Sequence, residues 1–283
     1  MAQESVSPSG QGYVVPQQGE YAAEFERLKK LADQARADGQ EVVVVMGLGF
    51  VGAVMAAIVA DTVDKKTGKP SKFVIGCQRP SVRSYWKIPL LNQGESPVKA
   101  EDPEVDPMIA RCVREKKTLV ATYNSDCLKL ADCVVVDVQC DYSKRDLGNL
   151  RTGEAEIAAL EATMRTIGRK VPAGCLVLIE TTVPPGTTEF IAFPIMKKAF
   201  TARGIKTDPL LSHSFERVMP GREYVSSIRD FWRVCSGVNP EARGRVVKFL
   251  TEVLNTEKFP LTVMDRPIES ETTKIVENSY RAT

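Results

Sequence analysis

Three long polar side chains fall on one helical stripe near the end of the chain, with Lys274, Asn278 and Arg281 at i, i+4 and i+7. A lysine beside a reacting oxygen can accept or supply a proton, and its ammonium form stabilises an oxyanion. An amide one turn further along adds a neutral donor. A charged stripe of this kind is more often a solvated helix face. The spacing alone therefore leaves acid–base chemistry and a plain surface as alternatives.

The second chemical motif is a glycine loop, GLGFVG, at residues 47–52. It directly follows a β-branched run and opens a segment rich in helix formers. In such a loop Gly47 permits the tight turn, Gly49 lets the backbone approach a pyrophosphate, and Gly52 lets the helix pack close to the sheet. The pattern predicts a dinucleotide site. The alternative is a glycine turn without a ligand.

The residue that should bind the adenosine ribose is not acidic. Dinucleotide-binding folds place a carboxylate about 20 residues beyond the loop, but here the end of the second strand carries Gln78, followed by Arg79 and Arg83. An amide can bind a ribose hydroxyl, yet it cannot repel a 2′-phosphate as a carboxylate would. NAD and NADP both stay open.

Composition indicates an ordinary globular protein. The chain has 283 residues, 43% hydrophobic and 26% charged, with a net charge of +2 that gives no reason to expect nucleic-acid binding. Seven cysteines without metal-ligand spacing, and no signal peptide, favour reduced thiols and a cytoplasmic location. His213 is the single histidine, so a His-rich metal site is excluded and we expect no metal. We interpret His213 as structural.

One uncharged stretch, residues 42–60, is long enough to cross a bilayer as a helix. Its internal order is a β-branched run, then three glycines, then helix formers, which suits a strand–turn–helix better than one helix. We therefore expect no membrane contact.

The pattern of apolar segments alternates between strands and helices. Expected strands are 41–46, 72–77, 118–121, 133–138, 174–180, 208–212, 232–236 and 260–264; expected helices are 19–38, 51–61, 104–116, 124–131, 154–170, 188–203, 240–255 and 268–282. Such alternation predicts an α/β fold with a doubly wound, Rossmann-type parallel sheet. We expect an N-terminal extension at 1–40, flexible over 1–18, then a dinucleotide-binding domain at 41–266 and the start of a central linking helix at 267–283. In the tract SIRDFWRVCSG, we expect the aromatic residues in the core and both Arg229 and Arg233 at the surface.

Four further segments resemble stretches of one protein family, and they occur along this chain in the same order as in that family. ETTVPPGTT (180–188), FERVMPG (215–221), LNQGESPV (91–98) and ENSYRA (277–282) are similar to stretches of the UDP-glucose/GDP-mannose dehydrogenases. Pro220 stands where the UDP-glucose enzymes carry a second glutamate. This form resembles the branch that oxidises UDP-N-acetylmannosamine and UDP-N-acetylglucosamine.

The resemblance implies oxidation of a sugar 6-hydroxymethyl group to a carboxylate, with NAD as oxidant. The implied cofactor contacts are Gly47, Gly49, Phe50, Val51, Gly52, Gln78, Arg83, Cys140 and Thr182. Cys140 replaces a threonine of the family, so its contact is a departure from the pattern.

The same resemblance implies roles for the helical stripe. The implied catalytic residues are Lys274 as general acid/base, Asn278, Glu216 as acceptor of a proton from water, and Thr182; the implied substrate contacts are Arg217, Val218, Lys274, Asn278 and Arg281. Family members use a nucleophilic cysteine in a Gly-rich loop, and none of the cysteines here lies in one. We therefore expect an amino-terminal portion of a longer enzyme, homodimeric through the central helix. This portion should bind cofactor without sustained turnover.

The sequence leaves two alternative functions open. A 6-phosphogluconate or 3-hydroxyacid type dehydrogenase shares the layout, although ETTVPPGTT and FERVMPG argue against it. A non-catalytic nucleotide-binding or regulatory domain is the other, because Gln78 and Cys140 both replace family residues. The sequence does not select one UDP-sugar.

Overall fold

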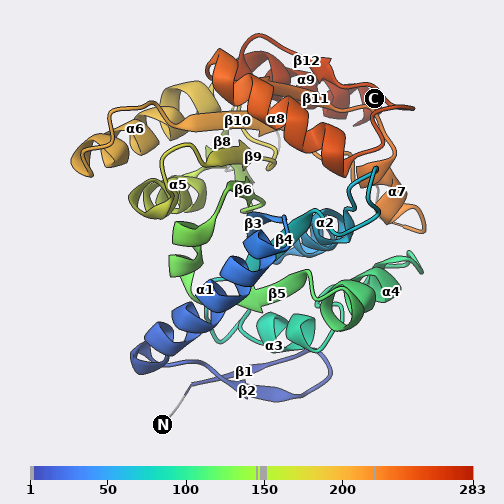
Figure 1. The fold of residues 1–283 in the computed structure, drawn as a ribbon. Helices are drawn as coiled ribbons and strands as arrows, with labels where there is room; N and C mark the ends of the chain where they lie inside the picture. The colour runs from blue at the N-terminus through green and yellow to red at the C-terminus, as the bar shows by residue number, and fades with distance from the viewer. Residues whose placement is uncertain (1–2, 145, 147–151, 219–220, 283) are drawn as a thin grey trace.

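The computed structural model describes residues 3–144, 146, 152–218 and 221–282, and its centre is an eight-stranded sheet (Figure 1). The strand order is β12-β11-β10-β9-β6-β3-β4-β5. The strands are β3 (Glu41–Met46), β4 (Lys72–Cys77), β5 (Leu119–Thr122), β6 (Cys133–Val136), β9 (Leu176–Ile179), β10 (Leu210–Ser214), β11 (Val234–Gly237) and β12 (Thr262–Val263). All neighbours pair in parallel except β10 and β11. The chain order reverses between β3 and β6, which confirms the doubly wound prediction.

Helices cover both faces of this sheet (Figure 1). They are α1 (Tyr21–Ala37), α2 (Phe50–Asp61), α3 (Lys87–Asn92), α4 (Val105–Ala110), α5 (Ala158–Lys170), α6 (Phe193–Ala202), α7 (Tyr224–Arg229), α8 (Pro240–Val253) and α9 (Pro267–Ala282). Short 3-10 helices occupy Gln18–Glu20 and Ser125–Leu130, and π-helical turns occupy Arg111–Glu115 and Thr187–Ala192. Helices α2, α4, α7 and α8 contribute to one apolar cluster, and α1, α5 and α6 to the other.

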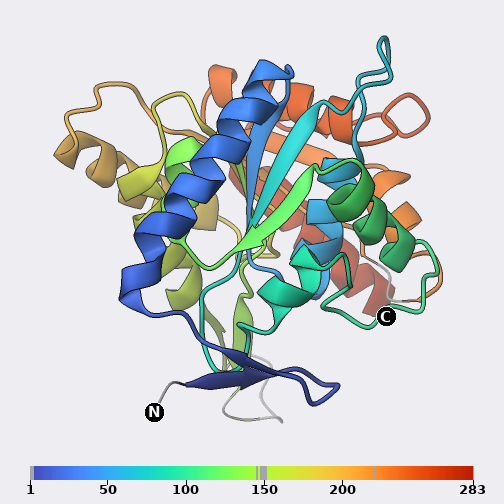
Figure 2. The ribbon, with the colours of Figure 1, turned by 60° about the horizontal axis from the view of Figure 1, so that its bottom comes forward.

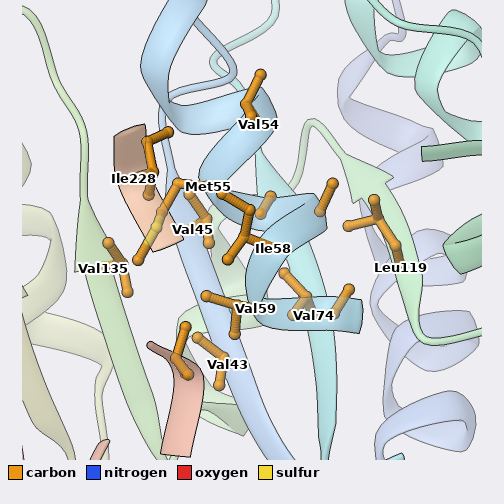
Figure 3. Close-up of a cluster of buried hydrophobic side chains, with 14 of the residues drawn as sticks. Val43, Val45, Val54, Met55, Ile58, Val59, Val74, Leu119, Val135 and Ile228 are labelled. Carbon is orange, nitrogen blue, oxygen red and sulfur yellow. The ribbon is translucent and has the colours of Figure 1, made fainter. Parts of the chain in front are cut away.

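Strand β3 explains why the core has two halves. Its side chains alternate, so Val43 and Val45 belong to one cluster while Val42 and Val44 belong to the other. Figure 3 shows Val43 and Val45 beneath α2, with Ile58 on that helix turned toward them. A strand buried on both faces needs an uninterrupted apolar run, which is what the sequence supplies there.

Helix α2 is buried on every side from Gly52 to Ala60. This burial accounts for the uncharged stretch 42–60, which forms β3, the glycine loop and α2 as expected. Within the part of the chain that the structure describes, no helix combines the length and the apolar character needed to span a membrane.

The expectation of a flexible lead-in is wrong for the described residues of 1–18. Strands β1 (Glu4–Val6) and β2 (Gly12–Val14) form an antiparallel hairpin. The side chain of Ser5 is buried, and its Oγ accepts a hydrogen bond of 3.2 Å from the Trp86 backbone N–H. A contact 81 residues away in sequence therefore fixes a segment whose composition indicated a loose coil.

Two other expectations are corrected. A second hairpin, β7 (Asp141–Lys144) and β8 (Gly153–Glu156), takes the first residues of the helix expected at 154–170, so α5 begins only at Ala158. The helix expected at 124–131 is a 3-10 helix. Asn124 caps it by accepting a 2.9 Å hydrogen bond from the Asp126 N–H.

We expect Ile58→Ala to lower the free energy of unfolding by about 2–5 kcal/mol, because Ile58 is 3% exposed and its loss leaves a cavity between α2 and the sheet. Val82→Ala is the control. That side chain is 47% exposed, so the change should stay within about 0.5 kcal/mol. Urea unfolding of both variants measures the difference, and equal losses would contradict this description of the core.

Candidate active site

The glycine loop between β3 and α2 has the geometry of a phosphate cradle. Gly47 has φ of 100°, and a Cβ there would lie 2.6 Å from the Asp137 carbonyl oxygen. A Cβ at Gly52 would lie 1.9 Å from the Gly47 carbonyl oxygen. Gly49 is the N-cap of α2, and a Cβ on it would meet no atom within 4 Å. The protein's own packing thus requires the first and third glycines, while the second borders open space, as close approach of a ligand demands.

A cavity of about 700 Å³ opens beside this loop. It lies at the carboxyl ends of β3, β4 and β6, where the strand order reverses. Its lining includes Met46, Gly47, Gly49, Cys77, Gln78, Arg79, Pro80, Lys87, Asp137, Val138, Gln139, Ala159, Ala162 and Thr163. The size and place suit a dinucleotide.

At one end of the cavity Gln78 is turned toward the glycine loop. Its Oε1 accepts a hydrogen bond of 2.8 Å from the Leu48 N–H. Arg79 and Lys87 also line the cavity there, and burial lowers the pKa of the Lys87 ammonium. Arg83, the basic residue that the sequence favoured, is exposed and does not belong to the described lining. Its carbonyl oxygen accepts a 3.0 Å hydrogen bond from the Trp86 indole N–H.

Other implied cofactor residues do not belong to the described lining of the cavity. Phe50 is exposed and stacks on Tyr224 with 4.7 Å between ring centroids, while Val51 is half-buried beside it. Cys140 and Thr182 are half-buried, outside the described lining. Their assigned contacts remain predictions.

Helix α9 is held against the sheet by its first turn. The Glu271 carboxylate accepts hydrogen bonds from the N–H groups of Gly186 at 2.5 Å and Thr188 at 2.8 Å. Both amides belong to the ETTVPPGTT segment. Ser270 Oγ shares a 2.7 Å hydrogen bond with His213 Nδ1 on β10. These contacts fix where the next turn, with Lys274, must lie.

Lys274 meets the segment that follows β10. Its Nζ donates a 2.8 Å hydrogen bond to the Glu216 carbonyl oxygen and lies 3.6 Å from Glu216 Oε1. Glu216 Oε2 accepts a 2.5 Å hydrogen bond from the Val218 N–H. Lys274 is only 9% exposed, and burial, with Arg217 and Arg233 nearby, lowers the pKa of its ammonium. A lysine with a lowered pKa is suited to proton transfer.

The rest of the stripe is exposed. Asn278 and Arg281 lie on the solvent side of α9, and Arg281 pairs with Glu277 at 3.2 Å. Glu277 also pairs with Arg217, whose pKa burial lowers to about 10. The structure thus brings Lys274, Glu216 and Arg217 together. Among the described ion pairs, Arg281 is connected to this group through Glu277, which pairs with both Arg217 and Arg281. Met219 and Pro220 of the FERVMPG motif lie outside the described residues.

Sequence reasoning missed three charged residues beneath this group. Arg233, expected at the surface, is fully buried and donates 2.5 Å and 2.7 Å hydrogen bonds to Glu180 Oε1 and the Phe215 carbonyl oxygen. Burial raises the pKa of Glu180, against the opposing effect of Arg233. Asp137 lines the cavity, and burial together with Glu180 and Glu216 raises its pKa well above the ordinary range. A charged residue directly after an apolar strand, as at Asp137 and Glu180, was the available signal.

The expected core packing of the aromatic residues near Arg233 is wrong for Trp232, which is 52% exposed. Arg229 is partly exposed and pairs with Glu104 at 2.9 Å. Arg233 can be buried because Glu180, which directly follows β9, pairs with its guanidinium. The adjacent Trp232 side chain is exposed to solvent instead.

His213 is fully buried, as its structural interpretation requires, and burial lowers its pKa from 6.5 to about 3. Since the unfolded chain binds a proton below pH 6.5 and the folded chain does not, stability is lost as pH falls from 6.5 toward 3.

The wild-type free energy of unfolding should therefore fall between about pH 7.5 and about pH 5, and His213→Gln should make that fall smaller by about 2 kcal/mol. Urea unfolding at both pH values tests this. Equal pH dependence in wild type and variant would contradict it.

Comparison with known proteins assigns this arrangement to a family. Residues 41–254 match the profile of the UDP-glucose/GDP-mannose dehydrogenase family, NAD binding domain. Among curated proteins, the chain is 27% identical to the UDP-N-acetyl-D-mannosamine dehydrogenase of Pyrococcus horikoshii, over 84% of this chain and 50% of that protein. It is 26% identical to the UDP-N-acetyl-D-glucosamine 6-dehydrogenase of Pseudomonas aeruginosa, over 84% and 49%.

A solved structure agrees with this assignment. The NDP-N-acetyl-D-galactosaminuronic acid dehydrogenase from Methanosarcina mazei superposes with a TM-score of 0.74 at 30% identity, covering 90% of this chain and 50% of that one. The chain spans about half the length of the curated relatives it matches. It belongs to the UDP-glucose/GDP-mannose dehydrogenase family and carries that family's NAD-binding domain at residues 41–254.

Proposed function

We propose that this chain supplies the cofactor half of an NAD-dependent nucleotide-sugar 6-dehydrogenase that acts on a UDP-N-acetylhexosamine. The observation that carries the proposal is the meeting of Lys274 with Glu216 next to Asp137, a residue of the cavity lining. The names of the relatives support the substrate class, since each acts on an N-acetylated sugar nucleotide or its uronate.

The chemistry assigns a task to each residue. NAD, when bound, accepts the hydride that leaves C6 of the sugar. Lys274 takes the hydroxyl proton, and its lowered pKa raises the neutral fraction available for that step. The resulting ammonium then stabilises the oxygen. Glu216 accepts a proton from water. Arg217 and Val218 line the sugar, and Asn278 and Arg281 also contact the bound substrate. Thr182 positions that water near the nicotinamide.

Six of the seven thiols have pKa values that do not support a covalent step. Family members complete the oxidation through a cysteine, but burial is the main cause that raises the pKa of Cys112, Cys127, Cys133, Cys140, Cys175 and Cys235. A raised pKa lowers the thiolate fraction, and the thiolate is the nucleophile.

Dimerisation through α9 is part of the proposal. Ile275, Val276 and Tyr280 are exposed on that helix. Helices that present apolar side chains to solvent commonly form contacts between subunits. A face of this kind on α9 supports the proposed homodimer.

Gly49→Val tests the cofactor site. We expect NAD binding to be lost, because a branched side chain fills the space that the pyrophosphate needs, while the fold persists since no protein atom lies within 4 Å of the new Cβ. Calorimetric titration with NAD, and with NADP for comparison, gives the affinities. Gly244→Val, another glycine bordered by open space, is the matched control and should bind NAD normally. A folded Gly49→Val protein with unchanged affinity would sink the assignment.

The substrate class has its own test. Thermal shifts with saturating NAD and a panel of UDP-N-acetylmannosamine, UDP-N-acetylglucosamine, UDP-glucose and GDP-mannose should favour the N-acetylated sugars. NADH absorbance should show no sustained production, because none of the cysteines lies in a Gly-rich loop and six of the seven have raised pKa values. Steady turnover would refute this and require a search for the nucleophile among the seven cysteines. Absence of any sugar-dependent shift would favour a nucleotide-binding domain without catalysis.

A further inference from the structure

A residue from outside the matched family domain reaches the cofactor cavity. The family profile begins at residue 41, but Tyr21, the first residue of α1, belongs to the cavity lining together with Gln78 and Arg79. Helix α1 ends at Ala37 and β3 begins at Glu41, so the two run in opposite directions and the start of α1 lies at the carboxyl edge of the sheet. Figures 1 and 2 both show this start beside the β1–β2 hairpin, at one end of the molecule.

The position of Tyr21 is fixed by the turn after β5. The side chain of Asn124 is buried, and its Nδ2 donates a 2.7 Å hydrogen bond to the Tyr21 carbonyl oxygen. Thr122 Oγ1 donates a 2.6 Å hydrogen bond to Glu24 Oε1, one turn further along α1. On the same stripe of α1, two turns after Tyr21, Leu28 is completely buried. The first turn of α1 is therefore part of a fixed wall.

Tyr21 contacts a second aromatic ring of the same wall. Its ring meets that of Tyr123 edge to face, with centroids 5.1 Å apart and an interplanar angle of 73°. Tyr123 also lines the cavity, and it is braced by Tyr85 at 6.0 Å. Because the Gln78 N–H donates a 3.0 Å hydrogen bond to the Thr122 carbonyl oxygen, this pair lies beside the residue at the ribose position.

Helix α5 lines the same cavity with short side chains, among them Ala159, Ala162 and Thr163, which leave its space open. A cavity lined by two aromatic rings and short side chains, next to the ribose position, suits a flat aromatic heterocycle.

We propose that Tyr21 and Tyr123 form the adenine-binding wall of the NAD site, so that the N-terminal extension supplies a binding residue to the cofactor. The inference rests on NAD binding at this cavity. It makes Tyr21 a determinant of affinity for the adenosine half of the cofactor, and it gives the extension a function beyond packing on the sheet.

The test compares NAD and ADP by calorimetry on full-chain variants. Tyr21→Ala should weaken NAD about tenfold, the size of one lost stacking contact, and should weaken ADP by the same factor. Tyr21→Phe keeps the ring and should bind like wild type, whereas Tyr21→Leu keeps apolar bulk without the ring and should be weakened. Tyr142→Ala, at an exposed tyrosine outside the described lining, is the matched control and should change neither affinity.

Each result decides the inference. Unchanged NAD affinity in Tyr21→Ala, or weakening of NAD without weakening of ADP, would overturn it. If Tyr21→Ala does not fold, Tyr21→Leu against Tyr21→Phe gives the same comparison. Wild-type protein that binds neither NAD nor ADP would instead overturn the cofactor assignment itself, which separates the two failures.

Discussion

The buried ion pair of Arg233 and Glu180 is the interaction on which the rest of the site depends. Both side chains are completely enclosed, and Arg233 also donates to the Phe215 carbonyl oxygen. One guanidinium thereby joins the end of β9, the segment after β10 and the start of β11. Removing either partner would leave an unpaired buried charge, which is far more costly than losing a surface pair. Because Glu216 directly follows Phe215, the carbonyl oxygen that receives Lys274 is positioned by the same pair.

The ETTVPPGTT segment has a structural role that its resemblance to a family motif does not reveal. Gly186 adopts φ of 93°, a conformation that L side chains rarely take, and this turns two backbone N–H groups toward one carboxylate, that of Glu271. An acidic side chain bound by two amides fastens α9 to the loop after β9. Lys274 comes one turn later on the same helix face. Two sets of hydrogen bonds to backbone atoms therefore fix the distance between Lys274 and Glu216. Glu271 fixes the helix that carries Lys274, and Arg233 fixes the segment that carries Glu216.

Much of the fold could be predicted because its signals are local. Strands β3 and β4 have the expected bounds, since an uninterrupted apolar run on a doubly covered sheet has few other solutions. The β1–β2 hairpin and the burial of Arg233 could not be predicted, because each depends on a partner distant in sequence, Trp86 and Glu180. Spacing also predicted basic residues near the ribose position. It could not tell that Arg79 and Lys87 line the cavity while Arg83 is exposed outside the described lining, because that depends on the tertiary placement of each side chain.

Asp137 connects the two halves of the site. It lines the cavity beside Gly47, yet Glu180 and Glu216 lie close enough, with burial, to raise its pKa. A carboxylate there would repel a pyrophosphate, whereas a protonated carboxyl group is neutral and can donate a hydrogen bond. Its Oδ2 is enclosed and has no hydrogen-bond partner within the described protein, which also favours the neutral form. Burial, together with Glu180 and Glu216, thus favours the neutral form of Asp137 in the cavity wall. Arg233 lies within ion-pair distance of Glu180, and Lys274 lies 3.6 Å from Glu216 Oε1.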